Sequence, residues 1–348
     1  MMTYAEIVGQ FHTFIPIIQH IDCVHTQLPA LFDRQIAFVG CGSSFRIAKS
    51  MAAMTQMRTG RPAMAFSGGD VLLHAERYTA CLEGCLLLAV SASGGEEELL
   101  MAVAHLRTLG CHFELVCLTC VKNTPLAAVS ESRSELPWSP TGVLAPVYPE
   151  MSLYFAFAYF LAKRYKDVQL MADLHTVAYQ GASFIRRMES RAANVATKSW
   201  NQGIVLGDAE LSGLCEEGAL AFKKICQVPS NNYHVLDARY GPMLLFDEET
   251  LVVVALGKGS DLEKQCVQDS LQKDAHVVVF TDNCRLDVEG VVTFSFGHPL
   301  SHVARGVLFV SLCQLLAYYK SFHNGSNPDA VGPEPLQDNS EDLLLATM

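Results

Sequence analysis

The sequence predicts an α/β fold made of two tandem, doubly wound parallel-sheet units of the flavodoxin-like or Rossmann-like kind. One observation is the alternation of short apolar runs of strand length with longer segments of helical period. A run such as residues 85–91 is almost entirely apolar, as a strand covered on both faces of a parallel sheet requires. A second observation is an internal repeat, because the run ending at Gly207 matches the run ending at Gly40, 167 residues earlier. The chain is therefore interpreted as two copies of one unit.

The first unit is expected to occupy residues 31–166, with strands and helices in alternation. Its first strand is apolar, and the helix that follows carries apolar residues three or four positions apart. The crossovers are long enough for right-handed parallel pairing. The expected strands are residues 36–39, 62–67, 85–91, 112–120 and 134–138, and the expected helices are residues 46–57, a segment opening at 96–98, and residues 153–165.

The other segments are assigned from their composition. Residues 1–30 are expected to form an amphipathic helical lead-in, and residues 167–200 connecting helices between the two units. The second unit takes residues 201–324, and the tail of residues 325–348 contains no Lys or Arg and is expected to be a loose wrap or a partner-seeking segment. In the second unit the expected strands are residues 203–207, 251–257, 275–281 and 291–296, followed by an apolar helix at residues 302–319.

Charge and composition argue against several function classes. The formal net charge of −11 and the lack of a basic run argue against nucleic acid, whereas a small anionic ligand is compatible with local backbone dipoles. We find no apolar run of the roughly 18 residues that span a membrane, and the first residues lack the pattern of a signal peptide. The 12 cysteines lie mostly in apolar runs, so buried free thiols in a cytoplasmic protein are expected.

The turn after the first strand has the composition of an anion site. Gly42, Ser43 and Ser44 follow the apolar run and open a helix, where unpaired N–H groups carry a positive partial charge. The spacing is neither the dinucleotide fingerprint nor a Walker loop. We expect phosphate or sugar binding here, although many strand-to-helix corners also favour Gly and Ser.

A second small-residue turn follows the strand at residues 85–91. Ser91, Ser93 and Gly95 lie at the carboxyl end of this strand, where open α/β sheets bind ligands. Glu96, Glu97 and Glu98 then open a helix, and acidic residues in a first turn complement the helix dipole.

These two turns resemble the phosphate-cradling turns of the SIS (sugar isomerase) family, whose second turn usually reads Ser-x-Ser-Gly-Glu-Thr. In the second half, residues 216–225 and 237–242 look like the Glu-Gly-Ala-Leu helix and the His-Gly-Pro turn of double-SIS proteins. That group includes the isomerase domain of glucosamine-6-phosphate synthase and the fructosamine-6-phosphate deglycases. The resemblance covers residues 30 to 325.

The resemblance implies a binding site and a reaction class. The two turns, as residues Gly42, Ser43, Ser44, Ser91, Ser93, Gly95 and Glu96, would hold the phosphate of a sugar phosphate. The pocket would lie between the subunits of a homodimer. A carboxylate would move a proton next to a carbonyl or Schiff base, giving an enol or enolamine. Neither a metal nor an organic cofactor is expected.

The sequence also departs from the family pattern at the positions of this chemistry. Lys224 stands where the usual proton-shuttling Glu is found, and Tyr240 replaces the usual His before Gly-Pro. Ala221 replaces a Lys, and Glu96 replaces the Thr that closes the second turn, where its charge would oppose a phosphate unless it turned outward. The tail has no counterpart of the basic residue that isomerases carry there.

Four residues are the candidates for catalysis, and three of them have a structural alternative. Glu217, beside Gly218, matches the family pattern and is either a pocket carboxylate or a helix-terminal acid. His234 is either a catalytic or a structural histidine. Lys224 could act as a base only if burial lowered its pKa, and otherwise lies on a solvated helix face. Tyr240 could hold a ring oxygen.

One further carboxylate lies next to the expected ligand. Glu150 follows Tyr148 and Pro149, where the first half of the family pattern has a Ser/Thr-Lys pair beside the ligand. We interpret Glu150 as a helix-start acid.

The expected function is that of an enzyme on an amino-sugar or fructosamine (Amadori) phosphate, either a deglycase or an aldose–ketose isomerase. The alternative is a sugar-phosphate sensor without catalysis, which the loss of the usual Glu and His favours. A third interpretation is that Glu96 marks a site for an unphosphorylated or cationic ligand.

Overall fold

The computed structural model describes residues 2–24, 34–136, 149–257, 259–281 and 288–329. The end of the expected lead-in, the last residues of the strand expected at residues 134–138 and most of the tail lie outside these ranges. The chain starts with one long helix, α1 (Met2–Val24), before the first sheet.

The first unit is a five-stranded parallel sheet with strand order β2-β1-β3-β4-β5. In a flavodoxin-like sheet this is the order 2-1-3-4-5, with the reversal of winding between the first and third strands. The elements are β1 (Ile36–Gly40), α2 (Gly42–Thr59), β2 (Ala63–Ser67), α3 (Gly68–Leu73), α4 (Ala75–Leu82), β3 (Leu86–Ser91), α5 (Glu97–Thr108), β4 (Glu114–Thr119), α6 (Pro125–Ala128), β5 (Ser132–Glu135) and α7 (Pro149–Arg164).

The second unit repeats the first. A single long helix, α8 (Val168–Ala196), leads to a second parallel sheet with order β10-β9-β8-β6-β7, which read from the other edge is the same 2-1-3-4-5 winding. The predicted pair of tandem, doubly wound units is therefore confirmed. The elements are β6 (Gln202–Gly207), η1 (Ala209–Leu211), α9 (Ser212–Cys226), β7 (Ser230–His234), η2 (Asp237–Arg239), η3 (Pro242–Leu245), β8 (Thr250–Ala255), α10 (Asp261–Leu271), β9 (His276–Thr281), β10 (Val292–Ser295) and α11 (His302–His323).

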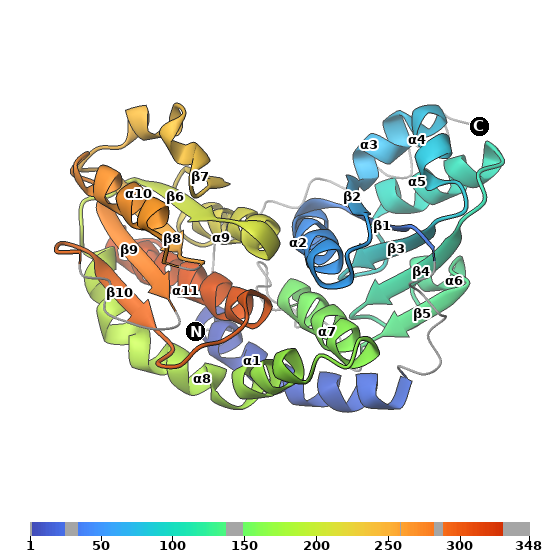
Figure 1. Cartoon of the computed structure of the whole chain (residues 1–348), viewed down its shortest axis with the longest axis horizontal. Helices are drawn as coiled ribbons and strands as arrows, with labels where there is room; N and C mark the ends of the chain where they lie inside the picture. Colours follow the sequence, from blue (N-terminus) through green and yellow to red (C-terminus); the bar gives the residue numbers. More distant parts are fainter. Residues whose placement is uncertain (1, 25–33, 137–148, 258, 282–287, 330–348) are drawn as a thin grey trace.

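One hydrophobic core is shared by both units. Helices α1, α2, α7, α8, α9 and α11 cover the inner faces of the two sheets, and α2 of the first unit packs against α9 of the second (Figure 1). The outer face of the first sheet has a separate core under α3, α4 and α5, and α10 covers that of the second. The shared inner core fixes the carboxyl ends of the strands of one unit relative to the helices of the other.

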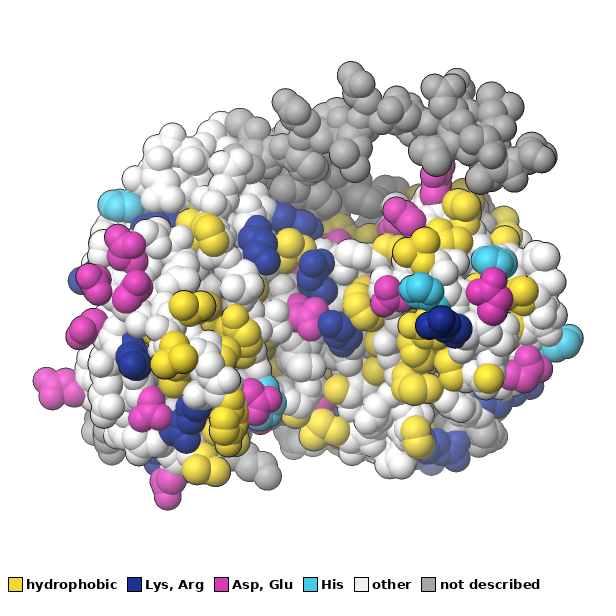
Figure 2. All heavy atoms as spheres, turned by 90° about the horizontal axis from the view of Figure 1, so that it is seen from above, with side chains coloured by type: hydrophobic (Ala, Val, Ile, Leu, Met, Phe, Trp, Pro, Cys, Tyr) yellow, Lys and Arg dark blue, Asp and Glu magenta, His cyan; other side chains and the backbone are white. Residues whose placement is uncertain are grey.

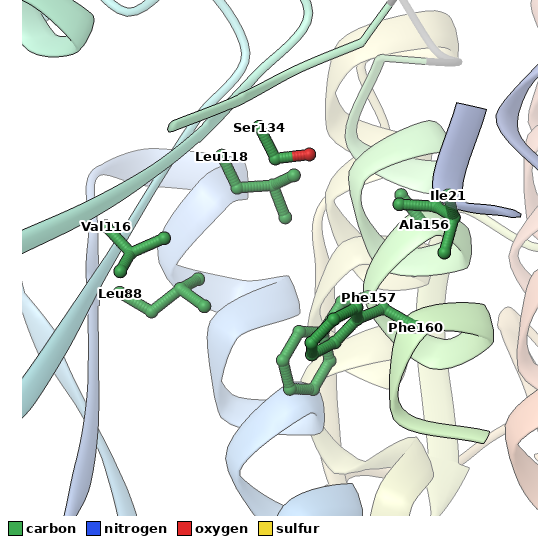
Figure 3. A pocket seen from close by; sticks show the side chains of 8 residues that line it. All are labelled: Ile21, Leu88, Val116, Leu118, Ser134, Ala156, Phe157 and Phe160. Carbon is green, nitrogen blue, oxygen red and sulfur yellow. The ribbon is translucent and has the colours of Figure 1, made fainter. Parts of the chain in front are cut away.

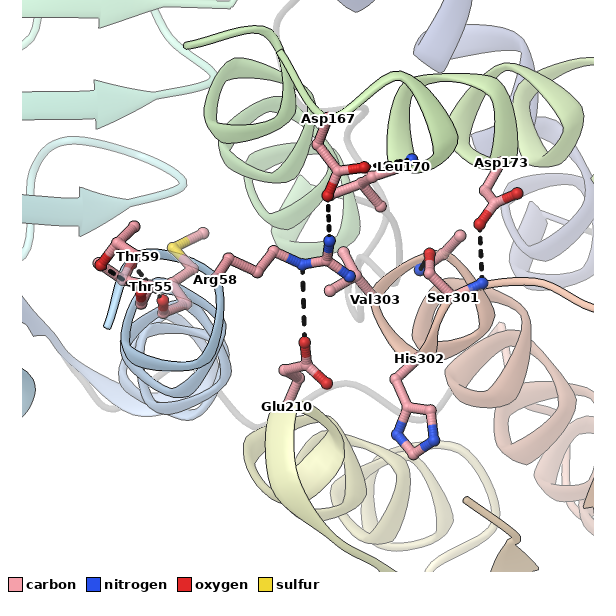
Figure 4. A network of polar contacts seen from close by, with 12 residues as sticks. Thr55, Arg58, Thr59, Asp167, Leu170, Asp173, Glu210, Ser301, His302 and Val303 are labelled. Carbon is pink, nitrogen blue, oxygen red and sulfur yellow. Dashed lines mark hydrogen bonds and ion pairs between the residues drawn. The ribbon is translucent and has the colours of Figure 1, made fainter. Parts of the chain in front are cut away.

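A polar network joins the two units beside this core. The guanidinium of Arg58, at the end of α2, pairs with Asp167 at the N-cap of α8 and lies 3.6 Å from a carboxylate oxygen of Glu210 in η1 (Figure 4). Asp173 accepts a hydrogen bond from the backbone N–H of Ser301 at 2.8 Å. These contacts hold the connecting helix against both halves.

An apolar cavity of about 30 Å³ lies inside the first unit (Figure 3). Leu88, Val116 and Leu118 line it from the sheet, and Phe157 and Phe160 line it from α7. No residue of the two turns singled out above lines it, so it is separate from them.

Helix α11 is long and apolar enough to cross a membrane by length and composition, contrary to the expectation that no segment would reach this size. However, 89% of its most apolar window is buried within the fold, where it packs on α8 and α9. Every cysteine in the described part of the chain is a free thiol, and most are buried.

Candidate functional site

The two turns expected to bind a ligand lie next to each other at the carboxyl edge of the first sheet. They follow β1 and β3, which are hydrogen-bonded neighbours, and the winding of the sheet reverses between them. A Cβ at Gly40 would lie 2.9 Å from the backbone carbon of Ser44 and 3.0 Å from the carbonyl oxygen of Val90. Gly40 therefore allows the start of α2 to approach the end of β3 closely.

The first turn places two hydroxyls in the first turn of α2. Gly42 adopts φ +54°, which glycine tolerates without strain, and Ser43 and Ser44 follow it and are buried. Cys41 is the N-cap, and its side chain makes no capping hydrogen bond. The N–H groups at this helix start are thus available to an anion.

Ser43 connects the two units through a short polar chain. Its hydroxyl accepts a hydrogen bond from the ammonium of Lys224 at 3.1 Å and donates one to a carboxylate oxygen of Glu217 at 3.2 Å. Both partners come from α9. Only 8% of Glu217 is exposed, and its second carboxylate oxygen has no hydrogen-bond partner within the described ranges. An unpaired buried oxygen of this kind is costly unless a ligand or water satisfies it.

A glycine contact brings α9 this close to α2. A Cβ at Gly213 would lie 2.0 Å from the carbonyl oxygen of Arg46. Beside it, the N–H of Leu214 donates to the hydroxyl of Ser50 at 3.0 Å, and Lys49 pairs with Glu216 at 2.7 Å. One turn further along α9, Glu217 therefore reaches Ser43.

Glu150, interpreted above as a helix-start acid, is influenced by the charges of this cluster. It lies in the first turn of α7 and is partly buried. Desolvation by burial and the nearby charge of Glu217 raise its pKa to about 7, Lys224 acts in the opposite direction, and Glu96 adds to the rise. The signal in the sequence was its position beside the expected ligand.

The second turn is closed by its own carboxylate. The Ser91 hydroxyl donates to the carboxylate of Glu96 and accepts from the N–H of Gly94 at 2.6 Å, while the N–H of Gly95 donates to the Ser93 hydroxyl at 3.1 Å. Glu96 is the N-cap of α5, but its side chain makes no capping hydrogen bond. Interaction with the helix dipole therefore explains Glu97 and Glu98. It does not explain Glu96, whose carboxylate turns toward Ser91.

His234 and Tyr240 do not join this cluster within one chain. His234, at the end of β7, is exposed, and its ring Nδ1 accepts from the N–H of Leu236 at 3.2 Å. Tyr240 is 87% exposed, and Leu244 and Leu245 after it are also exposed. The described residues contain no group of three His, Cys, Asp or Glu side chains that could hold a metal ion.

The molecular surface gives no sign of a polyanion site on the face seen from above. Figure 2 shows basic side chains interspersed with acidic and hydrophobic ones on this face, without a continuous basic patch.

Over residues 33–164 the sequence matches the SIS domain family. This match covers the first unit, which is therefore similar to SIS domains. It is 22% identical over 312 residues to glutamine–fructose-6-phosphate aminotransferase (isomerizing) of Pseudomonas aeruginosa, covering 85% of this chain and 50% of that protein. The same enzyme of Chlamydia abortus is 28% identical over 129 residues, which is 36% of this chain and 21% of that protein. The chain thus spans about half, or less, of the length of these relatives.

Solved structures with the same fold extend the likeness to nearly the whole chain. The C-terminal domain of glucosamine-fructose-6-phosphate aminotransferase from Francisella tularensis matches with a TM-score of 0.80 at 17% identity, over 94% of this chain and 98% of that one. Tagatose-6-phosphate ketose/aldose isomerase from Escherichia coli matches with a TM-score of 0.80 at 21% identity, over 96% and 97%. Both likenesses establish the fold, which extends over both units of the chain.

Proposed function

We propose that this protein binds a sugar phosphate at the carboxyl ends of β1 and β3 and catalyses proton transfer on it, as an aldose–ketose isomerase or a deglycase of amino-sugar or fructosamine phosphates. The observation that carries the proposal is the Ser43 hydroxyl held between Lys224 and Glu217 at the point where the sheet winding reverses. Relatives named for fructose-6-phosphate and tagatose-6-phosphate chemistry support the substrate class.

In this proposal the carboxyl groups of Glu150 and Glu217 carry the proton. One of them removes the proton from the carbon beside the carbonyl or Schiff base, and the electron pair forms an enol or enolamine. Returning the proton to the neighbouring carbon, while the hydroxyl proton passes to the former carbonyl oxygen, completes an isomerisation. A carboxyl group with a pKa of about 7, as for Glu150, can accept and return a proton near neutral pH. The ammonium of Lys224 would stabilise the oxyanion that develops.

The test is exchange of a substrate proton with solvent. The full chain is incubated in deuterated water with a panel of fructosamine, hexosamine and ketose phosphates, and deuterium in the sugar is measured by NMR. Incorporation beside the carbonyl, with or without release of an amine, supports the enzyme. A panel in which no compound binds contradicts the proposed ligand class.

A second candidate function is a sensor that binds a sugar phosphate without changing it. Specific observations favour it: Lys224 occupies the position of the usual carboxylate, and His234 and Tyr240 face solvent within one chain. The same incubation separates the two candidates, because a sensor binds a compound of the panel without any incorporation of deuterium.

We expect the serine hydroxyls to contribute directly to phosphate binding. Ser44→Ala or Ser93→Ala should weaken binding of an accepted sugar phosphate about 10-fold or more, because each variant removes a hydrogen bond to a charged group. Isothermal titration calorimetry measures the change, with Ser130→Ala as the control, since the Ser130 hydroxyl donates to the backbone carbonyl of Leu126 and contacts neither turn within the described ranges. Unchanged affinity in both serine variants would remove the phosphate assignment.

We also propose a homodimer in which the segment after β7 packs on a second copy. Tyr240, Leu244 and Leu245 expose 87%, 81% and 71% of their surface, which is costly for large apolar side chains in water. In a dimer this segment could bring His234 and Tyr240 to the site of the other subunit. The free thiols fit a reducing compartment, and we propose a cytoplasmic location.

The dimer makes a direct prediction for these exposed residues. The double variant Leu244→Ser, Leu245→Ser should shift the molar mass from that of two chains to that of one, as measured by light scattering after size-exclusion chromatography. Exposed Leu73→Ser and Leu262→Ser, on α3 and α10, serve as controls that should leave the dimer intact. A monomeric wild-type chain would contradict the shared site.

A further inference from the structure

We propose that Glu96 is a specificity-determining residue whose carboxylate occupies the position in the second turn where a phosphate would bind. A phosphate then binds there only when the Glu96 carboxylate moves away from Ser91. This inference rests on the proposed function, because it concerns the same site. It predicts that the chain, as it stands, binds phosphate less tightly than its two serine turns would otherwise allow.

The first argument is the hydrogen bonding of Ser91. A hydroxyl has one proton to donate, and the buried hydroxyl of Ser91 donates it to Glu96 while accepting from the N–H of Gly94 at 2.6 Å. A phosphate oxygen needs the same donor. The two anions therefore compete for one hydrogen bond at the end of β3.

The second argument excludes the ordinary role of an acid at a helix start. Glu96 is the N-cap of α5, yet its carboxylate caps no backbone N–H, and the exposed Glu97 and Glu98 supply the acidic charge of the first turn. Its carboxylate instead accepts from the Ser91 hydroxyl, and its charge contributes to the raised pKa of Glu150. Its carboxylate is thus directed toward the site, not along its own helix.

The third argument comes from the internal repeat. In the second unit, Glu263 lies in the first turn of α10, the helix that follows β8, three residues after the N-cap Ser260. Its carboxylate accepts hydrogen bonds from the N–H of Gly257 at 2.6 Å, and from the N–H and hydroxyl of Ser260 at 2.7 and 2.8 Å. The same turn thus binds a carboxylate of its own chain in both units. In the second unit this bonding belongs to a capping box at the start of α10, whereas the first unit has no such cap.

A neutral or cationic ligand group could bind in the second turn beside the Glu96 carboxylate, whereas a phosphate must displace it. A sugar hydroxyl or an ammonium group can donate to the Glu96 carboxylate, whereas a phosphate dianion meets like charge from Glu96 with Glu217 nearby. Glu96 therefore sets the balance between phosphorylated and unphosphorylated ligands.

The test uses inorganic phosphate as the probe and the full chain, with binding measured by NMR or calorimetry. Glu96→Gln keeps the size and an acceptor but removes the charge, and it should raise the affinity for phosphate about 10-fold. Glu97→Gln, an exposed residue on the same helix with the same change of charge, should raise it less than about 2-fold. Adding Ser91→Ala to Glu96→Gln should abolish the gain.

Equal phosphate affinity in wild type and Glu96→Gln overturns the inference, as does a gain that Glu97→Gln reproduces. The proposed function fails separately. If no compound of the sugar panel binds the wild-type chain or Glu96→Gln while the gain for inorganic phosphate is present, the substrate class is wrong and Glu96 keeps its role. If a sugar phosphate binds and exchanges but Glu96→Gln shows no gain, only the role of Glu96 is wrong.

Discussion

Gly213→Ala should destabilise the protein by about 3 kcal/mol, the upper end of what overpacking a close contact costs. The added methyl would lie 2.0 Å from the carbonyl oxygen of Arg46, and a backbone atom cannot move aside as a flexible side chain can. Helix α9 must then shift away from α2. The midpoint of urea unfolding, followed by circular dichroism, measures the loss.

The same substitution should damage the site, because Glu217 and Lys224 lie on the displaced helix. The matched control is Gly9→Ala in α1, where nothing lies within 4 Å of the added Cβ. In that helix interior alanine should stabilise by about 0.5–1 kcal/mol. Equal unfolding midpoints for the two variants would show that the two units are not in the close contact described above.

Glu150→Gln should lower the rate of deuterium exchange on the accepted sugar phosphate by about 100-fold or more, with little change in its binding. Glutamine keeps the shape of the side chain but cannot take up a proton. The control is Glu216→Gln, on α9 beside Glu217, whose carboxylate pairs with Lys49 at 2.7 Å. We expect that control to exchange at nearly the wild-type rate. Full activity of Glu150→Gln would assign the proton transfer to another group.

The pH dependence tests the same residue. With a pKa of about 7, Glu150 acts as a base only when deprotonated, so the wild-type exchange rate should rise with pH through about 7. Glu217→Gln removes a charge that raises this pKa and should move the midpoint to lower pH. Lys224→Met should move it to higher pH. A midpoint that neither substitution moves would contradict the coupling of these groups.

Stability should respond to pH in the opposite sense. The folded-state pKa of Glu150 lies above the ordinary value of 4.5, so the folded protein keeps a proton that the unfolded chain releases. The contribution of Glu150 to the free energy of unfolding is therefore present below pH 4.5 and is lost as the pH rises to about 7. In Glu150→Gln this component should vanish, as unfolding measured at pH 5 and pH 8 will show.

Much of the fold was predictable, because apolar periodicity reports burial on one face or both. The uninterrupted run at residues 85–91 indicated a central parallel strand, and β3 (Leu86–Ser91) pairs on both sides as such a strand should. The repeat between Gly40 and Gly207 indicated two similar units, and the two sheets have the same winding. Pattern alone did not show that one helix, α8, runs through most of the connecting segment.

The site was less predictable, because its chemistry depends on contacts between distant residues. Ser43 and Glu217 are 174 positions apart, and only the packing of α9 on α2 brings them together. Glu150 looked like an ordinary helix-start acid, since its raised pKa arises from burial and from charges on other elements. The hydrogen bond between Glu96 and Ser91 depends on the rotamer of the Glu96 side chain, which the sequence pattern does not predict.

A crystal structure of the protein with a bound fructosamine phosphate or hexosamine phosphate tests the central claim most directly. We predict that the phosphate lies within hydrogen-bond distance of Ser44 and Ser93 and that the Glu96 side chain has turned away from Ser91. The reacting carbons should lie beside Glu150 and Glu217. A ligand bound elsewhere, with the Glu96 carboxylate still bonded to Ser91, would contradict the account.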